Sequence, residues 1–195
     1  MLRVTTMKVC ALPIALLLIT SISLLGESAE IKWQWNVGDA SLDISQAPDG
    51  TLIAIGEHQM TALDPNNGQF IWQKTLSDPE EEINSPPTIG NQGTFYQRIW
   101  HDVNKTNRFA AISIETGEEA WSKDIDSGLQ AIWEDLIIVP TESKITALSQ
   151  ADGSIQWEIL PDIRFQNSVT VVDDVIFTTD GDGNDNYKIV GIDAT

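Results

Sequence analysis

The chain has 195 residues, of which 42% are hydrophobic, and its 29 acidic residues outnumber 11 Lys and Arg to give a formal net charge of −18. The hydrophobic fraction is too high for a disordered chain, and the length fits one domain or a piece of a larger one. The acidic balance argues against nucleic acid as a partner, because phosphate binding needs a basic surface, and against docking on anionic lipid headgroups.

Residues 1–29 have the three parts of a secretory signal peptide. Arg3 and Lys8 lie at or before the start of the uncharged, apolar stretch Val9–Leu25, and small residues follow that stretch where a peptidase would cut. An uncleaved anchor helix is the competing interpretation, but the stretch is short for a membrane span of about 20 residues. We therefore expect residues 30–195 to form the mature domain, and we expect that domain to be periplasmic or secreted.

Cys10 is the only cysteine of the chain, and it lies at the front of the apolar stretch. A lipoprotein would need a cysteine directly after that stretch, so we expect no lipid anchor by this route. The mature domain would then lack disulfides, a cysteine nucleophile and thiolate metal sites.

A pattern of eleven residues occurs three times after this leader. Each copy has Ala at the first place, Gly at the seventh and Trp at the eleventh; the copies are 62–72 (ALDPNNGQFIW), 111–121 (AISIETGEEAW) and 147–157 (ALSQADGSIQW). The first residues of the copies lie 49 and 36 residues apart, and a fourth copy begins at Gly191. Agreement at fixed offsets indicates an internal structural repeat.

Short runs of β-branched and aromatic residues around these motifs predict strands. In chain order we expect strands at 42–45, 51–55, 87–89, 94–99, 129–133, 136–139, 168–172 and 175–179, with turns between them. The Gly of each motif lies in a further hairpin turn, which leads into a strand that carries the Trp. No segment after residue 29 has a sustained helical period, so each unit is predicted to be a four-stranded antiparallel meander.

Four-stranded units at this spacing predict an all-β fold, a β-propeller whose blades pack around a central axis. The indole is a large apolar plate suited to the gap between two blades, and Gly permits a positive φ in the turn. Trp35 fits the same frame, so Ile31–Val37 is predicted to be an outer strand that completes the last blade from the other end of the chain. About four blades are then present, and we expect them to be a fragment of a 7–8-bladed ring.

The motifs resemble the tryptophan-docking motif of the PQQ-like, or quinoprotein-like, propeller family, Ala-x-Asp-x-x-x-Gly-x-x-x-Trp. The resemblance covers about residues 31–195, with Ser113 and Ser149 in the Asp place of the second and third copies. It implies a structural, blade-docking role for one set of residues: Ala62, Asp64, Gly68, Trp72, Ala111, Gly117, Trp121, Ala147, Gly153, Trp157 and Trp35.

This family contains dehydrogenases that hold PQQ and Ca²⁺, and cofactor-free scaffolds such as the periplasmic propeller that assists outer-membrane β-barrel assembly. The vicinal cysteines of several dehydrogenases and the lipobox of the assembly factor are both missing here. We expect an exported, non-catalytic scaffold without a cofactor, whose partners are other proteins of the envelope or an assembly complex. One alternative is a fragment of a PQQ-dependent alcohol or sugar dehydrogenase that lacks its cofactor-binding blades. Another is an exported module that binds polysaccharide or peptide.

Few other residues suggest chemistry. Asp180–Asn186 has oxygen ligands at alternating places, as calcium loops do, but it lacks the Gly and Glu of an EF-hand and is predicted to be a polar hairpin loop. His58 and His101 are the only histidines, and no nucleophile motif accompanies them. We therefore predict no catalytic or metal-binding residue.

Three features of the loops remain open. The acidic run Asp78–Glu82 is predicted to be a solvated loop, and Trp100–Arg108 is predicted to extend a hairpin, either as a contact surface or as an elaborated loop. Trp100 and Trp133 lie outside the docking frame; blade core is the prediction, and stacking on a planar ligand in the channel is the alternative. Cations in the channel would favour a quinone cofactor. Those that this chain offers, none of them firmly placed by the sequence, are Arg98, Arg108 and Arg164.

Overall fold

A computed structural model describes residues 30–35, 41–126, 128–141, 144–160, 165–181 and 187–194. The predicted leader at 1–29 and residues 36 and 37 of the expected N-terminal strand lie outside these ranges. The chain divides into two units, Met1–Gln34 and Trp35–Thr195, and every described strand belongs to the second. The described ranges contain no helix long and apolar enough to cross a membrane.

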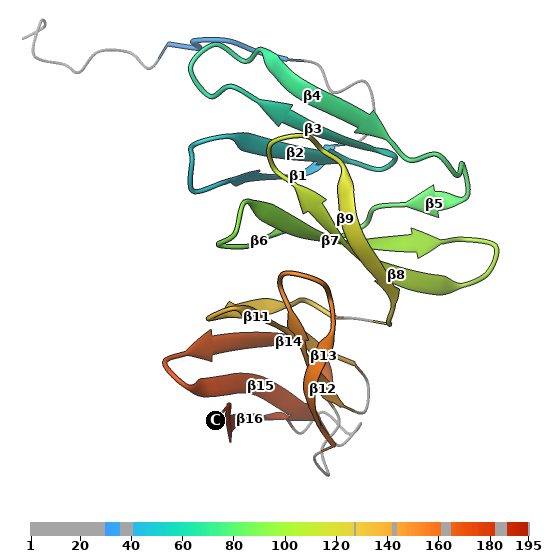
Figure 1. The fold of residues 1–195 in the computed structure, drawn as a ribbon, viewed down its shortest axis with the longest axis vertical. Helices are drawn as coiled ribbons and strands as arrows, with labels where there is room; N and C mark the ends of the chain where they lie inside the picture. The colour runs from blue at the N-terminus through green and yellow to red at the C-terminus, as the bar shows by residue number, and fades with distance from the viewer. Residues whose placement is uncertain are drawn as a thin grey trace, which may run out of the picture. The chain divides into compact units, whose positions relative to one another are not determined.

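The strands form four antiparallel sheets in chain order, which we call blades 1 to 4 (Figure 1). Blade 1 contains β1 (Ser41–Gln46), β2 (Leu52–Gly56), β3 (Gln59–Leu63) and β4 (Phe70–Thr75). Blade 2 contains β5 (Glu81–Glu82), β6 (Thr88–Ile89), β7 (Thr94–His101), β8 (Thr106–Ser113) and β9 (Glu119–Asp124). Blade 3 contains β10 (Ala131–Trp133), β11 (Leu136–Pro140), β12 (Ile145–Ser149) and β13 (Ile155–Ile159). Blade 4 contains β14 (Phe165–Val172), β15 (Val175–Gly181) and β16 (Tyr187–Asp193).

The predicted four-stranded meander is confirmed in blades 1 and 3, where successive strands pair in chain order. In blade 2 both β5 and β6 pair with β7, which is followed by β8 and β9, and the three described strands of blade 4 pair in chain order. The three complete copies of the motif have the same pairing register between the third and fourth strands of their blades. In each copy the Ala on the third strand lies opposite the Trp on the fourth: Ala62 and Trp72, Ala111 and Trp121, Ala147 and Trp157. A shift of register follows each pair. The all-β propeller architecture predicted from the repeat is therefore present.

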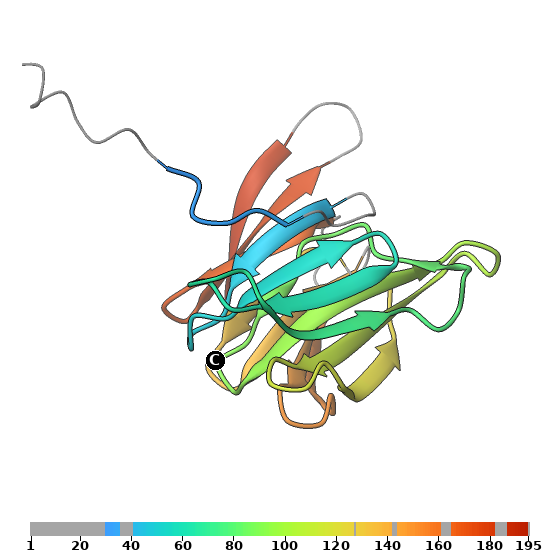
Figure 2. The same ribbon diagram turned by 90° about the horizontal axis from the view of Figure 1, so that it is seen from above.

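The hydrophobic core lies between blades rather than within one sheet. One cluster joins blades 1 and 2 and includes Ile53 and Phe95, a second joins blades 2 and 3 and includes Tyr96, and a third joins blades 3 and 4 and includes Ile138 and Ile176. Alternation along each strand sends successive side chains to opposite faces, so both faces of a middle blade are buried. Figure 1 shows blades 1 and 4 at the two ends of this stack, and Figure 2 looks along it.

The strand predicted at Ile31–Val37 is wrong over its described part. Residues 30–35 do not adopt a strand. Instead, the Trp35 ring meets the Phe70 ring edge to face, with centroids 5.2 Å apart. A strand exists only where a neighbouring strand supplies hydrogen bonds, and the local sequence pattern does not contain that neighbour.

Candidate interaction surfaces

Trp72 forms the seam, or contact, between blades 1 and 2. Its side chain projects from β4 and packs on the turn that precedes β9. Its indole Nε1 donates a hydrogen bond of 2.7 Å to the carbonyl oxygen of Ile114. Gly117 has a φ of +71°, and a Cβ there would lie 2.7 Å from the Trp72 ring. The ring also stacks on Phe95, with centroids 6.2 Å apart and planes 7° apart. Only a glycine combines this backbone conformation with so close an approach of the indole.

The seam between blades 2 and 3 repeats this arrangement. Trp121 Nε1 donates to the carbonyl oxygen of Gln150 at 3.1 Å, and a Cβ on Gly153, whose φ is +68°, would lie 2.7 Å from the Trp121 ring. Trp121 also lies against the buried rings of Tyr96 and Phe109. Two of the tryptophans therefore dock on the next blade in the same way.

A buried polar residue, Gln150, adds hydrogen bonds to this second seam. Its side-chain Nε2 donates to the carbonyl oxygen of Glu134 at 2.8 Å, and its Oε1 accepts from the Tyr96 hydroxyl at 3.3 Å. Burial raises the pKa of Tyr96, which keeps the phenol neutral, although a hydrogen bond with Thr94 acts in the opposite direction. Sequence reasoning missed Gln150, because Ile114 occupies the same place of the motif in blade 2 and no polar pattern marks it.

The residue at the third place of the motif accepts a backbone hydrogen bond in the turn that precedes the Trp-bearing strand. In blade 1 the Asp64 carboxylate accepts a hydrogen bond from the backbone N–H of Asn66 at 2.8 Å, and Gly68 has a φ of +70°. In the other copies the hydroxyls of Ser113 and Ser149 accept backbone N–H groups of their own turns at 3.3 and 3.2 Å. Serine thus supplies the same acceptor as aspartate, and the departure from the motif leaves the turn intact.

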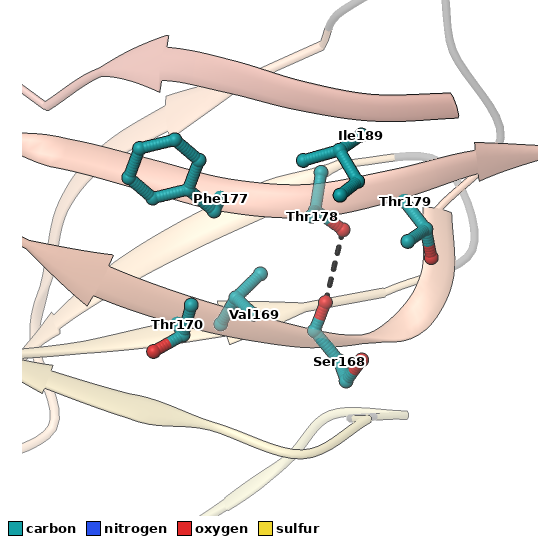
Figure 3. A pocket seen from close by; sticks show the side chains of 7 residues that line it. All are labelled: Ser168, Val169, Thr170, Phe177, Thr178, Thr179 and Ile189. Atoms are coloured by element: carbon teal, nitrogen blue, oxygen red, sulfur yellow. Dashed lines mark hydrogen bonds between the residues drawn. The ribbon is translucent and has the colours of Figure 1, made fainter.

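Blade 4 presents an apolar face with a hollow of about 270 Å³ (Figure 3). Val169, Phe177 and Ile189 supply apolar walls, and the Thr178 hydroxyl donates to the carbonyl oxygen of Ser168 at 2.9 Å. Trp157 belongs to the preceding seam, where it packs half-buried on the core shared by blades 3 and 4.

The predicted hairpin extension is present in blade 2. β7 and β8 pair as far as His101 and Thr106, and β5 covers the far end by pairing with Trp100 and His101. At the tip, Val103 is 65% exposed, and the ammonium of Lys105 lies 5.9 Å from the Trp100 ring. A polar hollow of about 320 Å³ lies beside the tip, between Lys105 and Asp126.

The interpretation of Asp78–Glu82 as a solvated loop is wrong for Glu81. This residue lies in β5, and its side chain is only 12% exposed. Its carboxylate accepts hydrogen bonds of 2.6 and 3.1 Å from the Arg108 guanidinium, which also bonds Glu119 at 2.6 Å. Burial alone would lower the pKa of Arg108, but the two carboxylates more than offset it and the pKa is raised. A run of like charges does not show which member has a partner elsewhere in the chain.

The other candidate residues are dispersed. His58 Nδ1 lies 2.9 Å from the carbonyl oxygen of Glu81, and His101 Nε2 lies 3.4 Å from Asp78. Arg98 bonds Asn84, and Trp133 packs on the core of blades 3 and 4, as predicted for a blade-core residue. Arg164 and residues 182–186 of the possible calcium loop lie outside the described residues. Elsewhere, the described residues contain no group of three or more His, Cys, Asp or Glu placed to hold a metal ion.

The repeated seams and four-stranded sheets define a β-propeller built from PQQ-like repeats. A model of the family described as outer membrane protein assembly factor BamB matches residues 21–135 and 105–195. The matches cover most of the chain, and the chain belongs to this family. Comparison with curated proteins gives no match.

Solved structures share the fold at low sequence identity. BamB from Moraxella catarrhalis has a TM-score of 0.66 and 15% identity, over 85% of this chain and 53% of that one. The computationally designed Ika4 protein has a TM-score of 0.58 and 14% identity, over 85% of this chain and 99% of that one. Quinohemoprotein alcohol dehydrogenase from Comamonas testosteroni has a TM-score of 0.54 and 14% identity, over 73% of this chain and 30% of that one. The chain therefore spans about half the length of the BamB structure it matches.

Proposed function

We propose that this chain is an exported propeller scaffold that binds other proteins during assembly of the outer membrane. The family match carries the proposal, because the family is described as an outer membrane protein assembly factor. The seams support a binding role. The motif residues make the contacts between blades, so turns and hairpins are left to form the outward surface. A propeller fold does not dictate a function, so the proposal rests on the family.

The tip of the extended β7–β8 hairpin is the proposed contact surface. Arg108 joins this hairpin to β5 through Glu81, which holds the extension in place. The tip exposes Val103 and half-exposes Trp100, an apolar pair beside the charged Lys105. Aromatic and apolar side chains on a preorganised support are typical of residues that dominate protein–protein affinity.

The proposal is tested in the host by deleting the gene and measuring the amount of β-barrel protein in the outer membrane. Wild-type chain should restore that amount, and Val103→Asp should restore it poorly, because it places a charge in the proposed apolar contact. The matched control is Ile155→Asp, which changes an exposed residue on the outer strand of blade 3. Unchanged outer-membrane protein after deletion would contradict the assembly role, and equal rescue by both variants would contradict the hairpin as the contact.

Export is part of the same proposal. The intact mass of the chain recovered from the envelope fraction should match a polypeptide that begins near residue 30, because residues 1–29 have the signal-peptide pattern. Recovery of the uncleaved chain from the cytoplasm would contradict export.

A second candidate function is oxidation of an alcohol or sugar with PQQ, which the fold likeness to an alcohol dehydrogenase favours. Of the cations that could approach such a cofactor, Arg108 is engaged by two carboxylates. Adding PQQ with Ca²⁺ to the purified chain separates the two functions. The scaffold proposal predicts no stoichiometric binding and no dye reduction with an alcohol or sugar, and either signal would favour the dehydrogenase.

A further inference from the structure

The tip of the β7–β8 hairpin carries the sequence pattern for attachment of a glycan to asparagine. Asn104-Lys105-Thr106 has the form Asn-x-Ser/Thr with a residue other than Pro in the middle, and it is the only such triplet in the chain. Asp102 lies two places before Asn104. It completes the longer pattern Asp/Glu-x-Asn-x-Ser/Thr, which bacterial oligosaccharyltransferases accept. The pattern can act only where the folded chain leaves it accessible, so its place in the structure is decisive.

The structure places the whole pattern on the surface. Each of the residues 102–106 is exposed, and together they form the turn of the hairpin and the first residue of β8. His101 pairs with Thr106 at the end of the hairpin, and the backbone N–H of Lys105 donates to the carbonyl oxygen of His101 at 2.9 Å. Figure 1 and Figure 2 both show this hairpin projecting outward from the blades, so a glycan on its turn would extend into solvent.

The side chains that an oligosaccharyltransferase must reach are held only by exposed contacts. Asn104 Nδ2 lies 3.3 Å from His101 Nε2, and Asp102 forms an ion pair of 2.6 Å with Lys105. The side chains of Asp102 and Lys105 are 61% and 64% exposed, and an exposed ion pair contributes little to stability. Thr106 lines the hollow of about 320 Å³ beside the tip, so space is open next to this residue. The turn can therefore present Asn104 without disturbing the core.

We propose that Asn104 is a site of N-linked glycosylation, with an oligosaccharide on a polyprenyl diphosphate as the donor. In the transfer, Nδ2 of Asn104 bonds to the anomeric carbon of the oligosaccharide, the bond from that carbon to the diphosphate oxygen breaks, and polyprenyl diphosphate leaves. The nitrogen gives up one proton, so the step needs no oxidant or reductant. Asp102 and Thr106 position the acceptor, because the carboxylate binds a cationic group of the transferase and the hydroxyl forms a hydrogen bond with the enzyme.

The glycan would regulate the proposed contact at this tip, and this consequence rests on the proposed function. Val103 is next to Asn104 and is 65% exposed. A hydrated oligosaccharide on the neighbouring residue covers that apolar side chain, so a modified chain cannot use it to bind a partner. The fraction of chains that carry the glycan then sets the fraction that can make the contact.

Transfer in vitro tests the acceptor without depending on export. The folded, purified chain is incubated with a bacterial oligosaccharyltransferase and a polyprenyl-diphosphate-linked oligosaccharide, and the mass of the peptide that contains Asn104 is measured. We expect that mass to increase by one oligosaccharide. Asn104→Gln should abolish the increase. Asn107→Gln is the matched control, because it changes an asparagine of the same hairpin that lies outside the pattern.

Conservative substitutions separate recognition from folding. Asp102→Glu and Thr106→Ser keep the pattern and should keep transfer, whereas Asp102→Asn and Thr106→Val break it and should lower transfer several-fold. Equal transfer to Asp102→Glu and Asp102→Asn would overturn the role of Asp102. No transfer to the folded wild-type chain would overturn the proposal, whether or not the unfolded chain is modified.

The mass of the chain recovered from the host envelope tests whether the site is used in the cell. A glycan on Asn104 is the expected result, and an unmodified Asn104 in every recovered chain would overturn glycosylation in the host. That outcome would leave the assembly role standing, because the gene deletion measures outer-membrane protein separately. Asn104→Gln should restore outer-membrane protein at least as well as the wild-type chain, and poorer rescue would contradict the shielding of Val103.

Discussion

At the scale of single residues, the blades are joined by one repeated contact, a tryptophan ring on a glycine of the next blade. The contact combines an apolar plate, one hydrogen bond from the indole nitrogen, and a backbone that only glycine adopts without strain. The same contact in two successive seams explains why Gly and Trp recur at fixed places, since each must match a residue of a neighbouring blade.

Replacing Trp121 with Ala should destabilise the chain by roughly 3–5 kcal/mol, the usual cost of removing a large aromatic ring from a core. The ring fills the seam between blades 2 and 3 and bonds Gln150. Urea unfolding followed by circular dichroism measures the change. Trp100→Ala is the control, because Trp100 lies outside the seams, and a loss below about 1 kcal/mol at Trp121 would contradict the docking role.

Carboxylates with lowered pKa values should make stability sensitive to acid. Hydrogen bonds from the backbone and side chain of Ser154 lower the pKa of Asp152, and a bond from Lys144 lowers the pKa of Glu158. A carboxyl whose pKa is lower in the folded state contributes stability at neutral pH, and that stability is lost as the pH falls through the folded value. The unfolding temperature should therefore fall on acidification below about pH 4.

Asp152→Asn should weaken this acid dependence, since it removes one of the titrating groups. Asp173→Asn is the matched control, because it changes an exposed aspartate in another turn of the chain. Thermal unfolding between pH 3 and pH 7 gives the comparison. An identical pH profile for Asp152→Asn and the wild-type chain would contradict the role assigned to the Ser154 bonds.

At the scale of elements, the extension of blade 2 depends on Arg108. This residue connects β8 to Glu81 of β5 and to Glu119 of β9. Arg108→Ala should cost about 1–3 kcal/mol, because it leaves Glu81 largely buried without a charged partner, although partial exposure reduces the effect. Faster amide exchange in β5 and at the ends of β7 and β8 should accompany it.

Lys105→Ala provides the comparison for Arg108, because Lys105 forms an exposed ion pair with Asp102 on the same hairpin. Its removal should change stability by less than about 1 kcal/mol. Equal effects of the two substitutions would show that Arg108 does not hold the extension in place.

The elements were predictable where the signal is local. Strands such as β2 and β11 follow from runs of β-branched residues, and the turns before Trp72 and Trp121 follow from Gly at a fixed place. Contacts between distant segments were not predictable. Strand β5 exists because it pairs with the extended hairpin, and Gln150 is buried because Tyr96 approaches it from another blade. Ile31–Val37 was predicted as a strand because Trp35 fits the frame of the other Trp-bearing strands, whereas a strand also requires a neighbouring strand as partner.

At the scale of the whole molecule, each blade is stabilised by its neighbours. Every core cluster among the described residues contains side chains from consecutive blades, so a middle blade loses one of its two shared core clusters when one neighbour is removed. Among the described residues, blade 4 packs on blade 3 alone, and its other face keeps apolar side chains such as Ile189 exposed. This architecture suits a scaffold, because hairpins project from a support that is held together between blades.

The central claim is that tryptophan docking on glycine joins the blades, and a double-mutant cycle between Trp121 and Gly153 tests it most directly. Gly153→Ala adds backbone strain whether or not Trp121 is present, because φ is +68°, but its Cβ collides with the ring only when the ring is there. The cycle subtracts the strain and leaves the contact. Urea unfolding should show that Gly153→Ala costs at least about 1 kcal/mol more in the wild-type chain than in Trp121→Ala. Additive effects, within about 0.5 kcal/mol, would contradict the account.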